Sequence, residues 1–431
     1  MLYNESMNFI NDSAKYGSKL GLENMQNLLE SIGNPHKDLK IVHVAGTNGK
    51  GSTCAMLNSI LTEAGYIVGL YNSPALVYFN EGIKLNSKAV TNEELAEVAS
   101  TIKLGIDTML GKGLDHPTQF EIVTAIAFEF YKLKKTDIVI LEVGMGGRLD
   151  ATNVIDTPLI SVITPIALDH LNFLGDTIAK VAREKAGILK ANCDVVVGKQ
   201  EDEAMEVIKE CAKQQNSRLT VVDYATLNIK SITKLGSIFD IKVDGNLYRD
   251  TKVRLIGEHQ IDNGIVALNV IANLQRKGYK ISEDSIRNGL AKVIWAGRLE
   301  LLSDRPTILI DGAHNLHGAK ALAKTIKAAF KYKRLIGVIG ILEDKDIGGV
   351  FNEILPLCDE VIFTKPDNPR AKYPSELISY AKQYGVEYNV EEHIIKAYKL
   401  GKSMLAQDDL LLCCGSLYMI GKIRGQVSAI Y

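Results

Sequence analysis

Residues 41–55, IVHVAGTNGKGSTCA, contain the residue types that bind a polyphosphate. A mostly apolar run ends in a glycine-rich turn, and Lys50, Ser52 and Thr53 then open a segment with helical spacing, in which Ser52 or Thr53 would supply a hydroxyl. In the order strand, glycine loop and helix, backbone N–H groups face phosphate, a lysine reaches the terminal phosphates and a hydroxyl ligates Mg²⁺. Because the loop is shorter than G-x-x-x-x-G-K-[ST], an ordinary turn stays an alternative at this point.

Two further side chains that could hold a metal follow or interrupt apolar runs. Glu142 stands inside the otherwise apolar stretch VILEVG, where a carboxylate is costly unless it is paired or bound to metal. His170 follows the apolar run 159–163 and stands beside Asp169. Magnesium prefers oxygen ligands, so a nitrogen ligand would be unusual. Glu142 is therefore a candidate magnesium ligand near the loop, and a second metal that accepts nitrogen would explain His170. A helix-capping or salt-bridged Glu142 and a structural His170 are the alternatives.

Several more polar residues are candidates for binding ATP or for the chemistry. Asp311, His314 and Asn315 follow the strand-like TILI, where an ordinary turn with an Asx cap is the alternative. Arg298 could clamp a phosphate, because a guanidinium is a rigid bidentate donor. Asn263 lies early in a predicted helix, where a capping amide is equally compatible. Lys185, between Glu184 and Ala186, is locally typical of a solvated lysine.

Apolar runs of strand length alternate with segments of helical spacing along most of the chain. The runs are 41–45, 66–71, 137–143, 159–163, 195–197, 307–310, 334–339, 360–363 and 409–414. This alternation predicts right-handed βαβ units and a mostly parallel sheet. Ligands then gather at the carboxyl ends of the strands. We therefore expect the polar turns after residues 45, 71, 143 and 163 to share one edge of a sheet.

The pattern changes in residues 219–256, where short alternating runs surround the turn Asp244-Gly245-Asn246. Such runs predict antiparallel strands. Strand–helix alternation restarts near residue 296. The sequence thus predicts an α/β protein with a P-loop domain of mostly parallel sheet at 1–295. A smaller, Rossmann-like α/β domain is predicted at 296–431.

Composition narrows the classes of partner. The 431 residues include 50 basic and 51 acidic side chains, and no basic tail indicates nucleic-acid binding. No apolar run reaches the roughly 20 residues that span a bilayer. The start, MLYNESMNFI, lacks the basic and then apolar pattern of a secretory leader. The six cysteines form no C-x-x-C pair and are typical of reduced, buried thiols. We expect a cytoplasmic protein that binds small molecules, with neither nucleic acid nor membrane as partner.

A series of short motifs runs in order along nearly the whole chain. They are GTNGKGST (46–53), NSP (72–74), FNE (79–81), TQFE (118–121), LEVGMGGRLDATN (141–153), ITPIALDH (163–170), AREKAGILK (182–190), GEHQIDN (257–263), WAGRLE (295–300), DGAHNLHGA (311–319), DKD (344–346), PRA (369–371) and GSLY (415–418). Together they resemble the Mur ligase superfamily and, within it, the folylpolyglutamate synthase/dihydrofolate synthase family.

The resemblance implies an ATP-dependent amide ligase. In this family ATP phosphorylates a substrate carboxylate, the amine of L-glutamate attacks the resulting acyl phosphate, and phosphate leaves. The implied substrates are ATP, L-glutamate and a folate or dihydropteroate. The implied cofactors are Mg²⁺ at two sites and a CO₂-derived carbamate on Lys185, with a monovalent cation as a further candidate. The carbamate would reverse the local interpretation of Lys185, because it turns a cation into an anion that binds metal.

Residues at the matching positions take their expected roles from the family. Those expected to bind ATP are Thr47, Asn48, Gly49, Lys50, Gly51, Ser52, Asn263, Arg298 and Asp311. Those expected to ligate magnesium are Ser52, Ser73, Glu142, His170 and Lys185. Those expected to act in catalysis are Lys185, His314 and Asp311. Those expected to contact the pterin are Thr118, Gln119, Phe120, Glu121 and Asp150.

The chain departs from the family pattern near the presumed folate contacts. Ala75 replaces a frequent histidine, and Tyr78 and Gly82 replace expected arginines. Two other classes of protein are alternatives to the folate ligase. A Mur ligase of peptidoglycan precursors would need a nucleotide-sugar domain before the loop, and only 45 residues precede Gly46. A non-catalytic P-loop module would not need a second metal site. We expect a monomer that closes about a hinge at 295–298.

Overall fold

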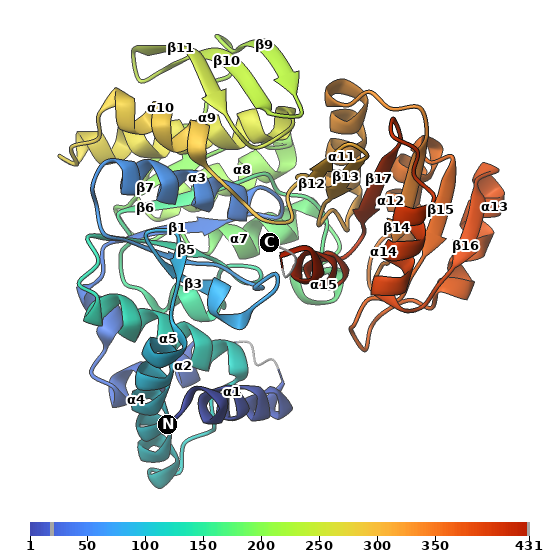
Figure 1. Ribbon diagram of the computed structural model, residues 1–431. Helices are drawn as coiled ribbons and strands as arrows, with labels where there is room; N and C mark the ends of the chain where they lie inside the picture. Colours follow the sequence, from blue (N-terminus) through green and yellow to red (C-terminus); the bar gives the residue numbers. More distant parts are fainter. Residues whose placement is uncertain (18–20, 429–431) are drawn as a thin grey trace. The chain divides into compact units, whose positions relative to one another are not determined.

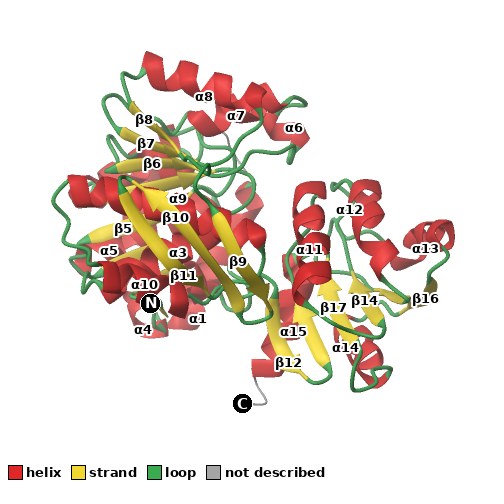
Figure 2. Ribbon diagram, turned by 90° about the horizontal axis from the view of Figure 1, so that it is seen from above, coloured by secondary structure: helices red, strands yellow, loops and turns green. Residues whose placement is uncertain are grey.

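The computed structural model describes residues 1–17 and 21–428. It divides into two compact units. Unit 1 comprises residues 1–226, 242–247 and 262–292, and unit 2 comprises residues 227–241, 248–261 and 293–431. Each unit contains one large, mostly parallel sheet with helices packed on it (Figures 1 and 2). The domain ranges 1–295 and 296–431 stay a prediction.

Unit 1 is built on an eight-stranded sheet with the order β4-β3-β2-β5-β1-β6-β7-β8. Its strands are β1 (Ile41–Ala45), β2 (Val68–Tyr71), β3 (Ile83–Leu85), β4 (Lys88–Ala89), β5 (Ile138–Glu142), β6 (Ile160–Ile163), β7 (Asp194–Val197) and β8 (Arg218–Val221). The run from β2 to β8 is parallel, and β3 and β4 form an antiparallel edge. The predicted neighbourhood of β2, β5, β1 and β6 is confirmed, so their carboxyl ends share one edge.

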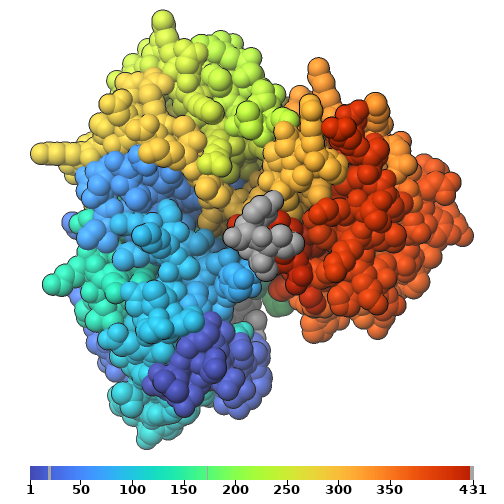
Figure 3. All heavy atoms as spheres, viewed as in Figure 1, coloured from blue at the N-terminus to red at the C-terminus, as the bar shows by residue number. Residues whose placement is uncertain are grey.

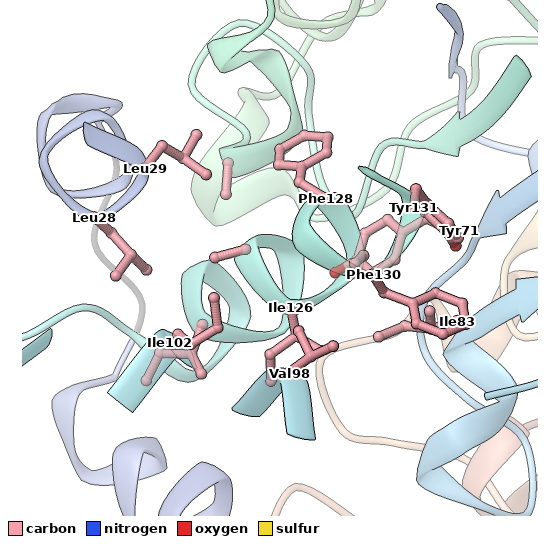
Figure 4. Packing of buried hydrophobic residues seen from close by; sticks show 14 of the residues in the cluster. Leu28, Leu29, Tyr71, Ile83, Val98, Ile102, Ile126, Phe128, Phe130 and Tyr131 are labelled. Carbon is pink, nitrogen blue, oxygen red and sulfur yellow. The ribbon is translucent and has the colours of Figure 1, made fainter. Parts of the chain in front are cut away.

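Unit 1 also contains helices, most of which bury an apolar face. They are α1 (Tyr3–Asp12), α2 (Glu23–Ser31), α3 (Lys50–Glu63), α4 (Asn92–Gly111), α5 (Gln119–Leu133), α6 (Leu171–Leu174), α7 (Ile178–Ala186), α8 (Asp202–Gln214) and α10 (Glu283–Lys292). In α4, Val98 and Ile102 are buried one turn apart and pack in a cluster with Ile126 and Phe130 of α5 (Figure 4). The helix α1 lies at the surface, with only Ser6 and Ile10 buried (Figure 3).

A three-stranded antiparallel sheet has the order β11-β10-β9. Its strands are β9 (Asn228–Thr233), β10 (Gly236–Val243) and β11 (Asn246–Val253). Asp244 and Gly245 both have positive φ, 50° and 83°, which suits a tight hairpin. The predicted hairpin is therefore confirmed. The expectation that the antiparallel region begins at residue 219 is wrong, because β8 follows α8 and pairs in parallel with β7. The helix α9 (Glu258–Arg276) comes next in the chain.

Unit 2 is built on a six-stranded sheet with the order β12-β13-β17-β14-β15-β16. Its strands are β12 (Glu300–Asp304), β13 (Thr307–Ile310), β14 (Leu335–Ile339), β15 (Glu360–Phe363), β16 (Glu387–Val390) and β17 (Leu410–Cys414). All are parallel except β12. Its helices are α11 (Leu316–Ala329), α12 (Ile347–Ile354), α13 (Ile378–Tyr384), α14 (Ile394–Ser403) and α15 (Leu417–Ser428). The predicted fold class, two α/β sheets, is confirmed.

Two further expectations concern the chain as a whole. All six cysteines are free thiols, and five of them are buried. Within residues 1–17 and 21–428, no helix is both long enough and apolar enough to cross a bilayer.

Candidate active site

The predicted order of strand, glycine loop and helix is present between β1 and α3. Gly46 and Gly49 have φ of 147° and 84°, a region that side chains disfavour. A Cβ on Gly46 would lie 1.9 Å from Thr164 Oγ1, and one on Gly49 would lie 2.3 Å from Asn263 Oδ1. The loop therefore needs glycine at both positions. This packing also brings Asn263, a predicted ATP contact, against the loop.

The first part of the loop is fastened to the segment after β6. The backbone N–H groups of Thr47 and Asn48 donate to the Pro165 carbonyl oxygen, at 2.9 and 3.2 Å. Thr47 Oγ1 donates to the Ala167 carbonyl at 2.9 Å and accepts from the Ala167 N–H at 3.0 Å. The N–H groups of Thr47 and Asn48 thus already have acceptors within the protein. The first turn of α3, which begins at Lys50, presents the remaining loop N–H groups, as the phosphate-loop interpretation requires.

Two lysine side chains converge on one carbonyl oxygen of the loop. Lys50 Nζ and Lys185 Nζ donate to the Gly46 carbonyl at 3.0 and 2.8 Å. Burial, and then the charge of Lys50, lower the pKa of Lys185 to about 7, against the opposing charges of Asp169 and Asp150. Lys185 is only 4% exposed, so the local interpretation of a solvated lysine is wrong. Its helix, α7, brings it to the loop.

The predicted metal ligands lie at or just beyond the ends of neighbouring strands. Glu142 ends β5, is buried, and stands opposite Val44 of β1. Ser73 follows β2 and is half-buried, and Ser52 is buried in the first turn of α3. His170 follows β6 with a left-handed backbone, φ 52°, and its Nε2 lies 4.0 Å from Asp169 Oδ1.

This set of ligand atoms consists mainly of oxygens, which suits Mg²⁺. Among the residues that the structure describes, no group of three His, Cys, Asp or Glu side chains could hold a metal. The predicted set relies on only two residues of these types, Glu142 and His170, and adds two serines and a modified lysine. The metal roles stay a prediction.

Three of the predicted pterin contacts, Thr118, Glu121 and Asp150, form hydrogen bonds with their own neighbouring turns. Thr118 and Glu121 form a capping box at the start of α5: Glu121 Oε2 accepts from the Thr118 N–H at 2.7 Å, and Thr118 Oγ1 accepts from the Glu121 N–H at 3.3 Å. Asp150 accepts from the Met145 N–H at 2.9 Å and from the Thr152 N–H at 3.0 Å. Burial raises the pKa of Asp150 despite these bonds. Each of these side chains therefore orders its own turn.

The other two pterin candidates, Phe120 and Gln119, do not hold a turn in this way. The Phe120 ring lies against Gly144, where an added Cβ would come within 2.5 Å of its Cζ. Its centroid is 6.3 Å from that of Tyr71, at the end of β2. Gln119 Nε2 donates to Asn11 Oδ1 at 3.4 Å. Phe120 thus presents an aromatic surface beside the ends of β2 and β5, and its pterin contact stays a prediction.

Asp150, Thr152 and His43 form a buried chain of hydrogen bonds that the sequence did not predict. Thr152 Oγ1 donates to Asp150 Oδ1 at 2.5 Å and lies 2.9 Å from His43 Nε2. Because the threonine has one hydroxyl proton, the Nε2–H of His43 donates to it. Burial lowers the pKa of His43 to about 3, which keeps the ring neutral. The signal was a histidine inside the apolar strand IVHVA.

In unit 2, the turn after β13 brings Arg298 and Asp311 together. Asp311 Oδ2 accepts from the Leu299 N–H, and Oδ1 accepts from the Ala313 N–H, both at 2.7 Å. A Cβ on Gly312 would lie 2.3 Å from Arg298 Nη1. Burial raises the pKa of Asp311, and the charge of Arg298 opposes that shift. The predicted pair is therefore adjacent, with Asp311 ordering the backbone on both sides.

His314 and Asn315 of the DGAHN motif also form hydrogen bonds to the neighbouring backbone. His314 Nδ1 lies 2.8 Å from the Gly312 carbonyl oxygen. Asn315 caps α11, because its Oδ1 accepts from the Gly318 N–H at 2.8 Å. The alternative of an Asx cap is thus correct for Asn315. His314 remains half-buried beside Asp311, and its catalytic role stays a prediction.

Comparison with known proteins agrees with this architecture. Residues 44–271 match the Mur ligase middle domain, and residues 297–417 match the Mur ligase, glutamate ligase domain. The glycine loop lies within the first match, and Arg298 and Asp311 lie within the second. The fold and the two strand-end sites thus define a ligase of the Mur class.

The relatives narrow this class. The dihydrofolate synthase/folylpolyglutamate synthase of Bacillus subtilis is 35% identical over 425 residues, which cover 98% of both chains. The folylpolyglutamate synthase of Mycobacterium tuberculosis, complexed with ADP, superposes with a TM-score of 0.91 at 29% identity, covering 99% of both chains. Escherichia coli FolC in complex with DHPP and ADP gives a TM-score of 0.87 at 31% identity, covering 99% of this chain and 98% of its own. The chain belongs to the dihydrofolate synthase/folylpolyglutamate synthase family.

Proposed function

We propose that this chain is an ATP-dependent amide ligase that adds L-glutamate to tetrahydrofolate, and also to dihydropteroate to form dihydrofolate. The observation that carries the proposal is the glycine loop, where Lys50 and the buried Lys185 meet at the Gly46 carbonyl. The family relationship over the whole chain supports the choice of substrates. ADP and phosphate are the other products.

The first step activates the substrate carboxylate. A carboxylate oxygen forms a bond to the γ-phosphorus of ATP, the bond to the bridging β–γ oxygen breaks, and ADP departs. Such a transfer depends on positioning and on neutralising charge rather than on covalent help from the protein. Lys50, the N–H groups in the first turn of α3, and Arg298 are the groups to which we assign that neutralisation.

The second step forms the amide. The amine of L-glutamate attacks the carbonyl carbon of the acyl phosphate, and the C–N bond forms. The bond between that carbon and the phosphate oxygen then breaks, phosphate leaves with the electron pair, and the nitrogen gives up a proton. We assign Asp311 and His314 to the surroundings of this intermediate. The carboxylate of Asp311 accepts two backbone N–H groups, which supports a role in fixing the turn that bears Arg298.

Ser52, Ser73, Glu142 and His170 are the residues we assign to two magnesium ions. Bound there, magnesium would neutralise phosphate charge during the transfer. We further assign a carbamate to Lys185: its neutral amine bonds to the carbon of CO₂ and a proton is released. The burial of this side chain and its pKa of about 7 support the reaction, because much of the amine is then neutral at physiological pH.

We place the pterin beside Phe120, with Thr118, Gln119, Glu121 and Asp150 around it. The FolC complex with DHPP and ADP supports a pteroate-type ligand in this family. Since Thr118, Glu121 and Asp150 already hold their own turns, we assign them to shaping the pocket as well as to contacting the ligand. The free cysteine thiols support a cytoplasmic enzyme, and we propose a monomer.

A phosphate-release assay tests the proposal. Purified protein is incubated with MgATP, L-glutamate and either dihydropteroate or tetrahydrofolate, and each mixture is repeated without glutamate. We expect glutamate-dependent release of phosphate with both pterins. Release with tetrahydrofolate alone would remove the dihydrofolate synthase activity from the proposal. An absence of release with either pterin would overturn the proposal.

A further inference from the structure

Gln200 is a half-buried side chain that the proposed chemistry does not use. It lies just beyond β7, next to β6 in the sheet of unit 1. Its Nε2 donates to the Thr164 carbonyl at 3.0 Å, and its Oε1 accepts from the Ile166 N–H at 3.0 Å. The amide therefore forms a hydrogen bond to the backbone on each side of Pro165.

Gln200 forms its hydrogen bonds to the segment 164–167. The same segment also forms hydrogen bonds to the glycine loop. The Pro165 carbonyl accepts the N–H groups of Thr47 and Asn48, and Ala167 exchanges two hydrogen bonds with Thr47 Oγ1. Residues 164–167 thus bond to the loop on one side and to Gln200 on the other. Hydrogen bonds therefore connect Gln200 to the loop through residues 164–167.

The geometry around Pro165 explains why this segment depends on an outside support. Proline has no N–H group, so it cannot fix its own position by donating a hydrogen bond. Thr164 already donates through both its N–H and its Oγ1 to the Ala45 carbonyl, which holds only the start of the segment. Without Gln200, the Thr164 carbonyl and the Ile166 N–H would lose their partners. The Pro165 carbonyl would then be free to shift.

From these contacts we infer that Gln200 is a positioning residue for the nucleotide loop and sets the affinity for ATP and ADP through residues 164–167. This inference rests on the proposed function, because it takes the loop to be the nucleotide site. It assigns Gln200 no contact with a substrate. A side chain that merely joined β6 to β7 would change stability and leave nucleotide affinity alone.

The test replaces Gln200 with methionine, which has a similar length and shape and lacks the amide. Calorimetric titration with ADP and Mg²⁺ should show binding weakened by about tenfold, the effect of losing two modest hydrogen bonds. The KM for ATP should rise in parallel, and the KM for the folate should stay within about twofold. The matched control is Gln214→Met, an exposed glutamine of α8 that bonds only within its helix to Glu210. It should bind ADP like the wild type.

A double-mutant cycle tests the connection itself. Thr47→Val removes the bonds to Ala167, so its effect on ADP affinity should be non-additive with that of Gln200→Met. Additive effects would overturn the inference, as would wild-type ADP affinity in Gln200→Met. If that variant fails to unfold cooperatively, Gln200→Asn, which keeps the amide on a shorter stem, replaces it with the same expectation. Failure of the wild-type protein to bind ADP would instead contradict the proposed function.

Discussion

The glycine loop of unit 1 and the aspartate turn of unit 2 both follow a parallel strand, yet opposite charges organise them. In the loop, the ammonium groups of Lys50 and Lys185 donate to one backbone carbonyl. In the turn, the carboxylate of Asp311 accepts two backbone N–H groups. The loop therefore concentrates positive charge, whereas the turn uses a negative charge to order its backbone.

This difference separates two kinds of functional residue. A lysine that donates to backbone carbonyls, as Lys50 and Lys185 do, adds little rigidity and much charge, so its loss should affect the reaction before the fold. An aspartate that satisfies two buried N–H groups holds the local backbone, so its loss should affect the fold first.

The largest effect is expected from Lys185→Ala. Turnover should fall by at least about a thousandfold, because the variant cannot form the proposed carbamate and loses a group held at the loop. Short carboxylates such as formate or acetate should restore part of the activity by standing in for the carbamate. Lys180→Ala, on the exposed side of the same helix, should keep wild-type turnover. Full activity of Lys185→Ala would remove Lys185 from the site.

A glycine-to-alanine substitution should destabilise the protein more in the glycine loop than in the aspartate turn. Gly46→Ala should cost about 3 kcal/mol of unfolding free energy and abolish measurable ADP binding, because its Cβ meets Thr164 at 1.9 Å and φ is 147°. Gly312→Ala should cost about 1–2 kcal/mol, since its Cβ meets the ends of two side chains that can move away, Arg298 Nη1 at 2.3 Å and Leu417 Cδ2 at 2.4 Å. Urea unfolding and ADP titration measure both variants. Equal costs would contradict the distinction between loop and turn.

Asp311→Ala should destabilise the protein by about 2–4 kcal/mol, because it leaves the N–H groups of Leu299 and Ala313 without an acceptor. The control is Asp304→Ala, whose side chain is 56% exposed at the end of β12. Urea unfolding should show little change in the control. A similar loss in both variants would show that Asp311 is not the group that orders the turn.

The pH dependence of two buried aspartates should have opposite signs. Burial raises the pKa of Asp311, so its contribution is complete below the unfolded-state pKa and falls as pH rises through the folded value. At Asp194, burial acts in the same direction, but bonds from Arg218 and Lys277 outweigh it and lower the pKa. Its contribution is therefore lost as pH falls. The cost of Asp311→Ala should shrink with rising pH, and that of Asp194→Ala should grow. Parallel trends in urea unfolding would contradict both assignments.

Much of the fold could be predicted from the sequence because buried parallel strands are continuous apolar runs. The runs at β1, β5, β14 and β17 were identified with nearly correct bounds. The strands β3, β4, β12 and β16 were missed because most of their residues are exposed or half-buried, so they form no continuous apolar run. The strand β8 was assigned to the wrong sheet for the same reason.

The candidate site was harder to predict because its geometry depends on distant contacts. Lys185 appeared solvated from its neighbours, and its partner Gly46 lies 139 positions earlier. Gln200 gave no signal, since only the neighbouring β6 and β7 bring it to Thr164. The motif TQFE was interpreted as a pterin contact, although Thr118 and Glu121 also satisfy the T-x-x-E capping box that the structure contains.

The most direct measurement follows labelled glutamate into the product. The protein is incubated with MgATP, ¹⁵N-labelled L-glutamate and tetrahydrofolate or dihydropteroate, and the pterin products are separated and weighed by mass spectrometry. We predict one labelled glutamyl group in the product for each ADP released with either pterin. ADP release without label in the pterin fraction, or no reaction at all, would contradict the assignment of a folate–glutamate ligase.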